Sequence, residues 1–375
     1  MNILAYVHLR NIYGSTGHGR VARQITEHLA QVTEDTLHIL ADPADHRNVV
    51  QKVGAPWTDF SYHFFEKETS RQQADWALSG RPLAEHYWPE AEIVYCTCES
   101  YVPTRKARLV VTLHDAAIFE DGTHPSGWLF HRERLKSGLI HRILSRKADL
   151  IHTVSHFSAE RITHFFPSLS SRLRIVHNAV SPCFFSPVPA EGKDALKQWG
   201  LADRRFVLLP GGLNYRKNAS LVLKAWPFVH QTHPDVQLVV AGHCEPAFLA
   251  SAKALEESVR LTGYVSDEIL CALYDAAEVV WFPSLYEGFG LPVLEAMARG
   301  TAVVASNSTS LPEVAGDAAV LVSPTSVSEH VDALRSLMED TRQREVLGQR
   351  GRRRAQQFTW QRSAAQLRQH FVSLT

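Results

Sequence analysis

The segment PSLYEGFGLPVLEAMARG, residues 283–300, decides how we interpret this sequence. An apolar run that ends at Phe282 predicts a buried strand, and Pro292 stands where the first turn of a helix is expected. The glycines between them allow a phosphate to approach the main chain, and the free amides at a helix start favour an anion. The segment therefore predicts a strand, an anion-binding loop and a helix, in that order.

Two carboxylates flank this loop. Glu287 precedes the backbone amides of residues 288–291 (Gly288, Phe289, Gly290 and Leu291), and Glu295 follows within the expected first helical turn. Carboxylates do not bind phosphate, so their natural partners are the hydroxyls of sugars that lie on either side of a bound phosphate. The alternative is an ordinary helix start at which the helix dipole favours glutamate.

A second segment, LLPGGLNYRKN at residues 208–218, repeats the arrangement of strand, glycine turn and helix. Gly211 and Gly212 form the turn, and Arg216 and Lys217 precede the helix. Two cations beside a glycine turn suit a diphosphate, because arginine can bind in a bidentate manner and lysine acts as a point charge. A solvated basic pair at a helix start is the alternative for this segment.

The amino-terminal loop GSTGHG, residues 14–19, also leads from a strand to a helix. Gly14 and Gly17 could hold a phosphate or simply turn the chain. The loop is not a G-x-G-x-x-G, although Asp42 follows the next strand at a position where an acid could hold a ribose. An NAD-dependent oxidoreductase therefore stays open as an alternative.

One histidine among the 20 in the chain is placed for chemistry. His114 follows the strand at 110–113, so it should face the same sheet edge as the glycine loops. There it can donate to a substrate hydroxyl or act in acid–base catalysis, while a histidine satisfied by core partners is the alternative. We expect no metal site, since His152 and His156 lack the intervening glutamate of a zinc-protease helix.

Length and composition describe an ordinary globular protein. The chain has 375 residues, 45% of them hydrophobic, with 39 Lys and Arg residues against 39 Asp and Glu residues. This length predicts two domains, at roughly 100–200 residues per domain. Zero net charge argues against a nucleic-acid-binding protein, which neutralises many phosphates at once.

Cysteine usage and hydropathy predict the compartment. The five cysteines are scattered and include no C-x-x-C, so we expect neither a zinc ribbon nor a disulfide framework. No apolar run reaches the roughly 18 residues that a membrane-spanning helix needs. We therefore expect a cytoplasmic protein, with any membrane contact peripheral and at the inner face of the membrane.

Strand-like runs alternate with helical patterns, which predicts an α/β fold of two Rossmann-like, doubly wound domains facing a central cleft. We expect strands at residues 2–9, 36–40, 91–96, 109–113, 150–154, 173–176, 206–209, 236–241, 279–282 and 302–305. We expect helices at residues 131–146, 219–230, 268–276, 293–299 and 330–339. A proline-rich stretch at 181–194 reads as a linker, so the predicted domains are residues 1–185 and 190–359.

The predicted helix at 131–147 is rich in arginine and lysine and also carries leucines and isoleucines. Such helices can lie on anionic membrane surfaces or engage a lipid-linked phosphate. A solvated charged face is the alternative.

The motifs EGFGLPVLEAMARG, GGLNYRKN, VTLHD, TVSHFSAERI, VHNAV and GYVSDEIL, taken in order, resemble the retaining glycosyltransferases of family 4, which have the GT-B fold. The resemblance covers nearly the whole chain, and Glu287 and Glu295 match the E-x7-E pattern of that family. It implies that the last helix, residues 360–375, crosses back to the amino-terminal domain.

The resemblance also implies roles for individual residues. Glu287 would contact a donor-sugar hydroxyl, Glu295 the ribose hydroxyls, and the amides of residues 288–291 the sugar and diphosphate. Arg216 and Lys217 would hold the diphosphate beside Gly211 and Gly212, with Gly14 and Gly17 approaching it from the other domain. His114 would line the sugar pocket, and Val265 would lie near the base.

Two departures from the family pattern stand out. Many relatives have a basic residue where this chain has Gly212, which puts one phosphate contact in doubt. The usual N-G-V is Asn178-Ala179-Val180 here, a change that affects only a turn.

The implied activity is retaining, metal-independent transfer of a sugar from a nucleotide donor, without any cofactor. The similarity favours mannose from GDP-mannose and a glycan or lipid-linked glycan acceptor in surface polysaccharide synthesis such as O-antigen. UDP- or dTDP-sugar donors, and a non-catalytic sugar-nucleotide binding protein, remain alternatives.

Overall fold

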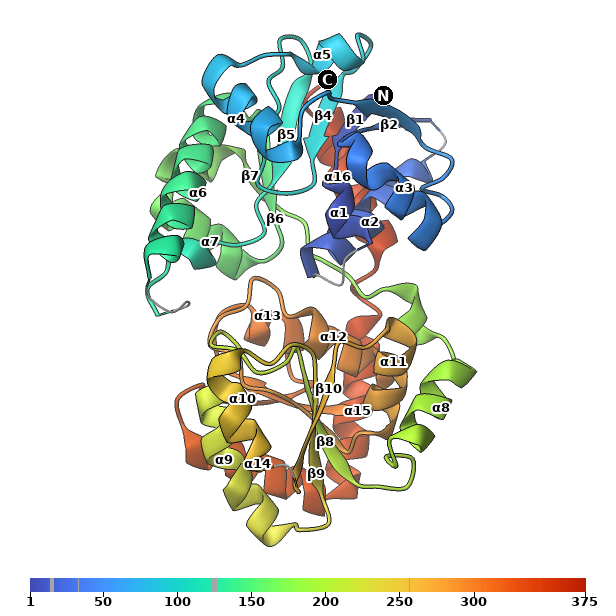
Figure 1. Ribbon diagram of the computed structural model, residues 1–375, viewed down its shortest axis with the longest axis vertical. Coiled ribbons are helices and arrows are strands. Elements are labelled where there is room, and N and C mark those ends of the chain that lie inside the picture. The colour runs from blue at the N-terminus through green and yellow to red at the C-terminus, as the bar shows by residue number, and fades with distance from the viewer. Residues whose placement is uncertain (14–16, 33, 123–126, 256) are drawn as a thin grey trace. The chain divides into compact units, whose positions relative to one another are not determined.

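The computed structural model describes all residues except 14–16, 33, 123–126 and 256, and it divides into two compact units (Figure 1). The first unit contains Met1–Phe119, residues 127–178 and Trp360–Thr375, and the second is built on Ala179–Thr359. Each unit has its own parallel sheet with helices on both faces, as the alternating pattern predicts.

The sheet of the first unit has seven strands in the order β3-β2-β1-β4-β5-β6-β7. Its strands are β1 Asn2–Tyr6, β2 Thr36–Ala41, β3 Ser61–Phe64, β4 Ile93–Cys96, β5 Arg108–Thr112, β6 Leu150–Thr153 and β7 Leu173–Ile175. Its helices are α1 Leu9–Ile12, α2 Gly17–Ala30, α3 Pro43–Lys52, α4 Thr69–Ser79, α5 Ala84–Tyr87, α6 Trp128–Lys147, α7 His156–Phe165 and α16 Trp360–Val372, with 3-10 turns at Ala117–Phe119 and Pro167–Arg172.

The sheet of the second unit has six strands in the order β10-β9-β8-β11-β12-β13. Its strands are β8 Phe206–Pro210, β9 Gln237–Ala241, β10 Val259–Gly263, β11 Val279–Phe282, β12 Ala302–Ser306 and β13 Val320–Val322. Its helices are α8 Ala190–Gln198, α9 Ala219–Thr232, α10 Pro246–Lys253, α11 Asp267–Ala276, α12 Leu291–Arg299, α13 Leu311–Ala315, α14 Val327–Glu339 and α15 Thr341–Ala355, after a 3-10 turn at Pro182–Phe185.

The cores explain why the strand runs are continuously apolar. Strands β8, β9, β11 and β12 are buried along their whole length, as expected for parallel strands covered by helices on both faces. In Figure 1, α9, α10 and α14 lie on one face of this sheet, and α11, α12 and α15 lie on the other.

The last helix, α16, belongs to the first unit and contacts α2. Leu367 and Phe371 are fully buried, and the Phe371 ring lies 5.5 Å from the ring of Tyr95 on β4. Arg368 forms an ion pair with Asp35 at 2.6 Å. The crossing back of the last helix is therefore confirmed, and so is the expectation of two Rossmann-like sheets.

The expected linker at 181–194 is partly wrong, because α8 begins at Ala190. Gly192 packs against α11, where an added Cβ would lie 2.4 Å from the carbonyl oxygen of Glu268. The proline-rich composition therefore describes only the residues before α8.

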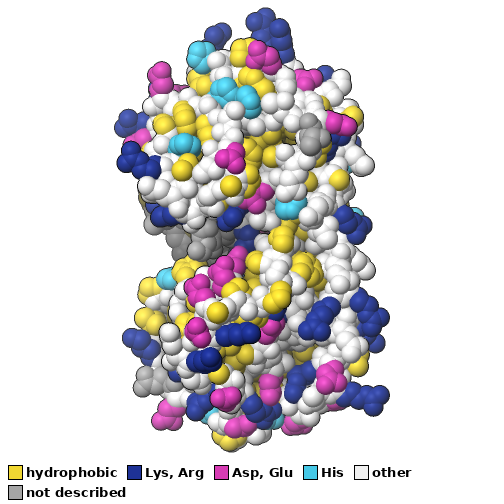
Figure 2. Space-filling view, turned by 90° about the vertical axis from the view of Figure 1, so that its right-hand side faces the viewer, with side chains coloured by type: hydrophobic (Ala, Val, Ile, Leu, Met, Phe, Trp, Pro, Cys, Tyr) yellow, Lys and Arg dark blue, Asp and Glu magenta, His cyan; other side chains and the backbone are white. Residues whose placement is uncertain are grey.

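Charges of both signs are interspersed over the face shown in Figure 2, in keeping with the equal numbers of basic and acidic residues. None of the described helices combines the length and the hydropathy needed to cross a bilayer.

Candidate active site

The two motifs of the second unit lie together at the point where its strand order reverses. Strand β8 has β9 on one side and β11 on the other, and β8 and β11 are parallel neighbours. The loop after β8, residues 211–218, and the loop after β11, residues 283–290, therefore begin side by side at the carboxyl edge of the sheet. In open α/β sheets this is where ligands bind.

Lys217 and Glu287 join these two loops through a buried ion pair. The Lys217 Nζ donates to Glu287 Oε1 at 2.6 Å, and the side chains are 10% and 8% exposed. The ammonium also lies 4.2 Å from the ring centroid of Phe282, at the end of β11. Asn214 fixes the lysine main chain, because its Oδ1 accepts from the Lys217 amide at 3.0 Å.

Burial and charge act on the pKa values of this pair. Burial opposes ionisation of Glu287, but the charges of Lys217 and Arg216 outweigh it and lower the pKa of the carboxyl. Burial lowers the pKa of Lys217, and the charge of Glu287 offsets part of that effect. At neutral pH the glutamate is an anion held in place by the lysine.

The glycine turn after β8 permits a backbone packing that side chains would block. Gly211 and Gly212 have φ values of 91° and 78°, and both amides donate to the carbonyl oxygen of Ala241. An added Cβ at Gly212 would lie 1.9 Å from the carbonyl oxygen of His243. A basic side chain at this position is therefore incompatible with the turn as it is built here.

The loop after β11 ends at a left-handed residue that starts α12. Gly290 has a φ of 102°, and an added Cβ would lie 2.6 Å from Leu311 Cδ2. Phe289 is buried, with its ring 5.8 Å from that of Phe358. Leu291 is the first residue of α12, and Pro292, which has no amide hydrogen, is the second. The amides of Val293 and Leu294 donate to the carbonyl oxygen of Gly290.

Glu295 lies further along α12 than we expected, because the helix begins at Leu291 and not at Val293. It is the fifth residue of the helix, beyond the first turn, and it is 1% exposed. The hydroxyl of Tyr274, on α11, donates to Glu295 Oε2 at 3.1 Å. A carboxylate buried in this way requires polar partners, and the tyrosine supplies one.

The remaining predicted residues of this unit lie at the same edge of the sheet. Arg216 is half-buried, and its carbonyl accepts from the Leu285 amide at 2.9 Å, which ties the two loops together. Gly288 is buried in the loop after β11. Val265 is half-buried between β10 and α11, two strands away from β8.

In the first unit, His114 is a buried and neutral imidazole. Burial lowers its pKa to about 4, with a further contribution from His18, whose ring stacks on it at 4.3 Å. The ring donates to the carbonyl of Thr97, which leaves Nε2 as a buried acceptor without a partner among the described residues. His114 can therefore accept from a hydroxyl in this tautomer, and its contact with a substrate hydroxyl stays a prediction.

Glu99 orders the main chain at His114. Its Oε1 accepts from the His114 amide at 2.8 Å. Burial opposes ionisation of Glu99, but the two neighbouring histidines outweigh it and lower the pKa of the carboxyl. We did not single out Glu99 from the sequence, although its place in the loop after a buried strand was the available signal.

A polar cluster that sequence reasoning also missed lies where the first sheet reverses, between β1 and β4. The His8 Nε2 lies 3.2 Å from Ser100 Oγ, and Gln73 Nε2 lies 3.0 Å from the same histidine nitrogen and 3.1 Å from the same hydroxyl. Burial lowers the pKa of His8. This position is equivalent to that of the loops after β8 and β11, but it carries an imidazole, a hydroxyl and an amide, with the carboxylate of Glu99 next to Ser100 in the chain.

The glycines of the amino-terminal loop are placed only in part. Gly14 lies outside the described residues, and Gly17 is the first residue of α2. Asp42 caps α3 and accepts from the amides of Ala44 and Thr69 and from the Thr69 hydroxyl. Its carboxylate is thus occupied by the fold, which argues against its use for a cofactor ribose.

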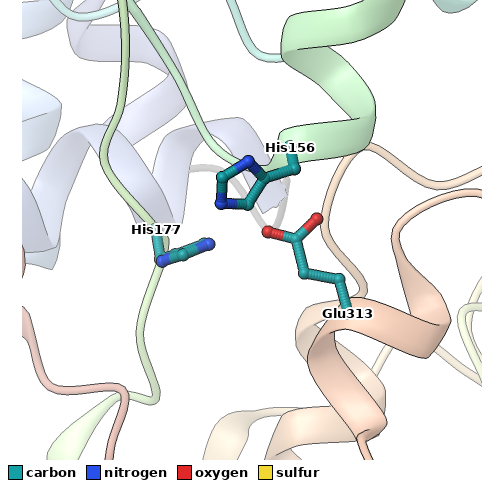
Figure 3. Close-up of side chains that lie close together, drawn as sticks. All are labelled: His156, His177 and Glu313. Carbon is teal, nitrogen blue, oxygen red and sulfur yellow. The ribbon is translucent and has the colours of Figure 1, made fainter.

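His152 and His156 lie in different surroundings. The His152 Nε2 lies 2.7 Å from Thr112 Oγ1, and burial lowers the pKa of this imidazole to about 3, as for a core histidine. The ring of His156 lies 6.0 Å from that of His177 (Figure 3). Glu313, the third side chain drawn there, belongs to α13 of the second unit, and we infer no metal site from the two imidazoles.

Comparisons with known proteins identify the family. Residues 193–354 match the family model of glycosyl transferases group 1. The O-antigen chain mannosyltransferase B of Escherichia coli is 37% identical over 284 residues, which is 73% of either chain. The chain belongs to the group 1 glycosyltransferases. Another relative, the MMP alpha-(1->4)-mannosyltransferase of Mycolicibacterium hassiacum, is 35% identical over 60% of this chain and 54% of its own.

Solved structures place this glycosyltransferase in the GT-B fold. The sucrose-phosphate synthase of Thermosynechococcus elongatus superposes with a TM-score of 0.75 over 100% of this chain and 99% of its own. Its sequence is 20% identical, so the similarity concerns the fold alone. The resemblance to family 4 that the motifs indicated is confirmed.

Proposed function

We propose that this glycosyltransferase moves mannose from GDP-mannose to a hydroxyl of a glycan or lipid-linked glycan, with retention of configuration at the transferred carbon. The relatives named above are mannosyltransferases, which favours this sugar. UDP- and dTDP-sugars are the alternative donors, because base selectivity depends on few residues such as Val265.

The observation that carries the proposal is the buried Lys217–Glu287 pair at the carboxyl edge of the second sheet, with Arg216 beside it. A leaving nucleoside diphosphate is an anion, so positive groups fixed in a desolvated site lower the barrier to its departure. Lys217, Arg216 and the amides at the start of α12 supply that charge. We therefore propose that transfer needs no metal ion.

The carboxylates and the histidine would orient the sugar. Glu287, ionised and held by Lys217, would accept from a donor-sugar hydroxyl, and Glu295 would accept from the ribose hydroxyls. His114 would accept from a further sugar hydroxyl through its unpartnered Nε2. In a front-face reaction the departing phosphate oxygen takes the proton of the attacking hydroxyl, so no protein nucleophile is required.

The proposed acceptor site belongs to the first unit, whose strand reversal carries hydroxyl, amide and imidazole groups rather than cations. Such groups can exchange hydrogen bonds with a neutral glycan. A growing surface polysaccharide such as O-antigen is the substrate class that this assignment favours.

A thermal-shift panel of GDP-, UDP-, dTDP- and ADP-sugars, each with and without EDTA, tests the donor. We expect the largest rise in melting temperature with GDP-mannose, unchanged by EDTA, and release of GDP when a mannan oligosaccharide is added. A larger rise in melting temperature with another nucleotide sugar would show that this sugar, and not GDP-mannose, is the donor. Stabilisation without turnover would indicate a binding protein. NADH, titrated by fluorescence, should not bind.

A further inference from the structure

Helix α6 is apolar on two faces, and the core accounts for only one of them. Leu144 is fully buried, and Ile140 and Ile143 pack against the same core cluster. His141 lies on this inner side too, with its ring 5.0 Å from that of Phe119. These residues are sufficient to attach the helix to the first unit.

The opposite face carries three large apolar side chains that the fold leaves uncovered. Trp128, Leu135 and Leu139 are 73%, 76% and 53% exposed. With 3.6 residues per turn they lie within about 40° of one another around the helix axis, and they form one stripe. Exposed apolar residues scattered singly need no explanation, whereas a continuous stripe on one helix does.

Cations surround this stripe. The α6 outer face consists of the three apolar residues and the exposed basic residues Arg132, Lys136, Arg142, Arg146 and Lys147. The Arg132 guanidinium lies 5.4 Å from the Trp128 ring centroid and 3.2 Å from Glu133, which is the single acidic residue of the helix. No described carboxylate forms an ion pair with the other four cations.

Helix α15 shows what an arginine-rich helix looks like when its cations serve the fold. Arg344, Arg352 and Arg354 donate to backbone carbonyls of neighbouring elements, for example Arg352 to the carbonyl of Arg299 at 3.0 Å. The single large apolar side chain that α15 exposes is Val346, at 42%. The basic residues of α6 therefore differ in kind from those of α15.

We propose that the α6 outer face docks on a bilayer that contains anionic lipids. Trp128, Leu135 and Leu139 would enter the boundary between headgroups and acyl chains, and the surrounding cations would contact lipid phosphates. Charge decides between this occupant and a protein partner, because a net excess of four positive charges around an apolar stripe matches an anionic lipid surface. The proposal goes beyond glycosyl transfer and does not depend on which donor is used.

Flotation of the full chain with vesicles tests this docking, in the absence of any sugar nucleotide. We expect binding to phosphatidylcholine vesicles that contain phosphatidylglycerol, and much weaker binding to phosphatidylcholine alone. Replacing Arg142 and Arg146 by glutamine should weaken binding about thirtyfold, since each surface cation contributes a factor of about five. Replacing Leu135 and Leu139 by serine should weaken it by at least about tenfold.

Matched controls come from the same chain. Arg342→Gln with Arg353→Gln removes two exposed guanidinium groups from α15, and Leu78→Ser removes an apolar side chain that is 84% exposed on α4. Neither change should alter vesicle binding. Transfer to a water-soluble acceptor should be unchanged in every α6 variant. Flotation therefore tests docking, and the transfer assay tests the proposed function independently.

Three results would overturn the proposal. One is equal binding to vesicles with and without phosphatidylglycerol, and another is an α15 control that loses as much binding as the α6 arginine pair. The third is self-association that Leu135→Ser with Leu139→Ser abolishes while vesicle binding stays unchanged, because the face would then be a contact between two copies.

Discussion

The two sheets reverse their strand order in the same way but carry different side chains at that point. In the second unit the loops after β8 and β11 hold an ionised pair, Lys217 and Glu287. In the first unit the residues after β1 and β4 hold His8 and Ser100, with His114 after the neighbouring β5. Burial lowers the pKa of both histidines, so they are neutral near pH 7.

If the proposed function holds, this difference divides the work of a bisubstrate reaction between the two units. An anionic leaving group requires fixed positive charge, whereas a neutral acceptor requires groups that exchange hydrogen bonds without charge. The shared fold supplies only the position of each site, and the loops determine its chemistry.

The largest expected effect comes from removing charge in the second unit. Lys217→Met should lower kcat/KM about a thousandfold, because a preorganised cation at the leaving group is lost. It should also destabilise the second unit by about 3 kcal/mol, because Glu287 becomes a buried, unpaired charge. Turnover assays and chemical denaturation measure the two effects separately.

A double variant separates catalysis from folding at this pair. Lys217→Met with Glu287→Gln should recover most of the lost stability, because no charge remains unpaired, while turnover stays abolished. Recovery of turnover in the double variant would mean that the pair serves the fold and not the donor.

A smaller effect is expected from the histidine of the first unit. His114→Phe keeps a ring that can stack on His18 but removes the Nε2 acceptor, so kcat/KM should fall about tenfold, the value of one neutral hydrogen bond. With a pKa of about 4, His114 should produce no inflection near pH 6.5 in the rate profile. An inflection there that disappears in His114→Phe would assign acid–base catalysis to this residue instead.

The smallest expected effect is a difference in acid sensitivity between the units. His114 and His152 have folded-state pKa values of about 4 and about 3, both below the ordinary value of 6.5. The unfolded chain therefore binds more protons below pH 6.5, and stability falls as the pH drops from 6.5 towards 4. At pH 5.5 each histidine should destabilise the first unit by about 1 kcal/mol.

The second unit should respond less over the same range. Its described residues include one histidine with a strongly lowered pKa, His330, at about 4. The pKa of Glu287 is also lowered, so the stability that it contributes is lost only below pH 4.5. Hydrogen exchange at pH 7.5 and 5.5 measures each unit, and an equal loss of protection in both would contradict the comparison.

Sequence reasoning located the buried strands well, because continuous apolar runs are unusual outside a covered parallel sheet. The strand Val279–Phe282 has the expected bounds, and β8 differs by one residue. The edge strands β3, β10 and β13 were missed, since most of their residues are only partly buried. Helix α8 was not predicted, because the prolines before it suggested a linker that extends to residue 194. In the structure the helix begins at Ala190.

The site was predictable where a motif fixes the backbone and unpredictable where tertiary contacts decide. Glycines before a helix correctly predicted the loops at Gly211 and Gly290. Both glycines have φ values in the left-handed region. The partner of Lys217 lies 70 residues away, and no spacing rule predicts such a pairing. The tautomer of His114 likewise depends on a carbonyl of another strand end, which only the fold reveals.

The crossing of α16 back to α2 has a consequence for the order in which the chain folds during synthesis. Domains generally fold one after another as the chain leaves the ribosome. Here the sheet of the first unit emerges early, but Leu367 and Phe371, which are buried against it, are translated after the whole second unit. The second unit can therefore be finished while the first still exposes apolar surface on α2, and a chaperone has its longest opportunity to bind there.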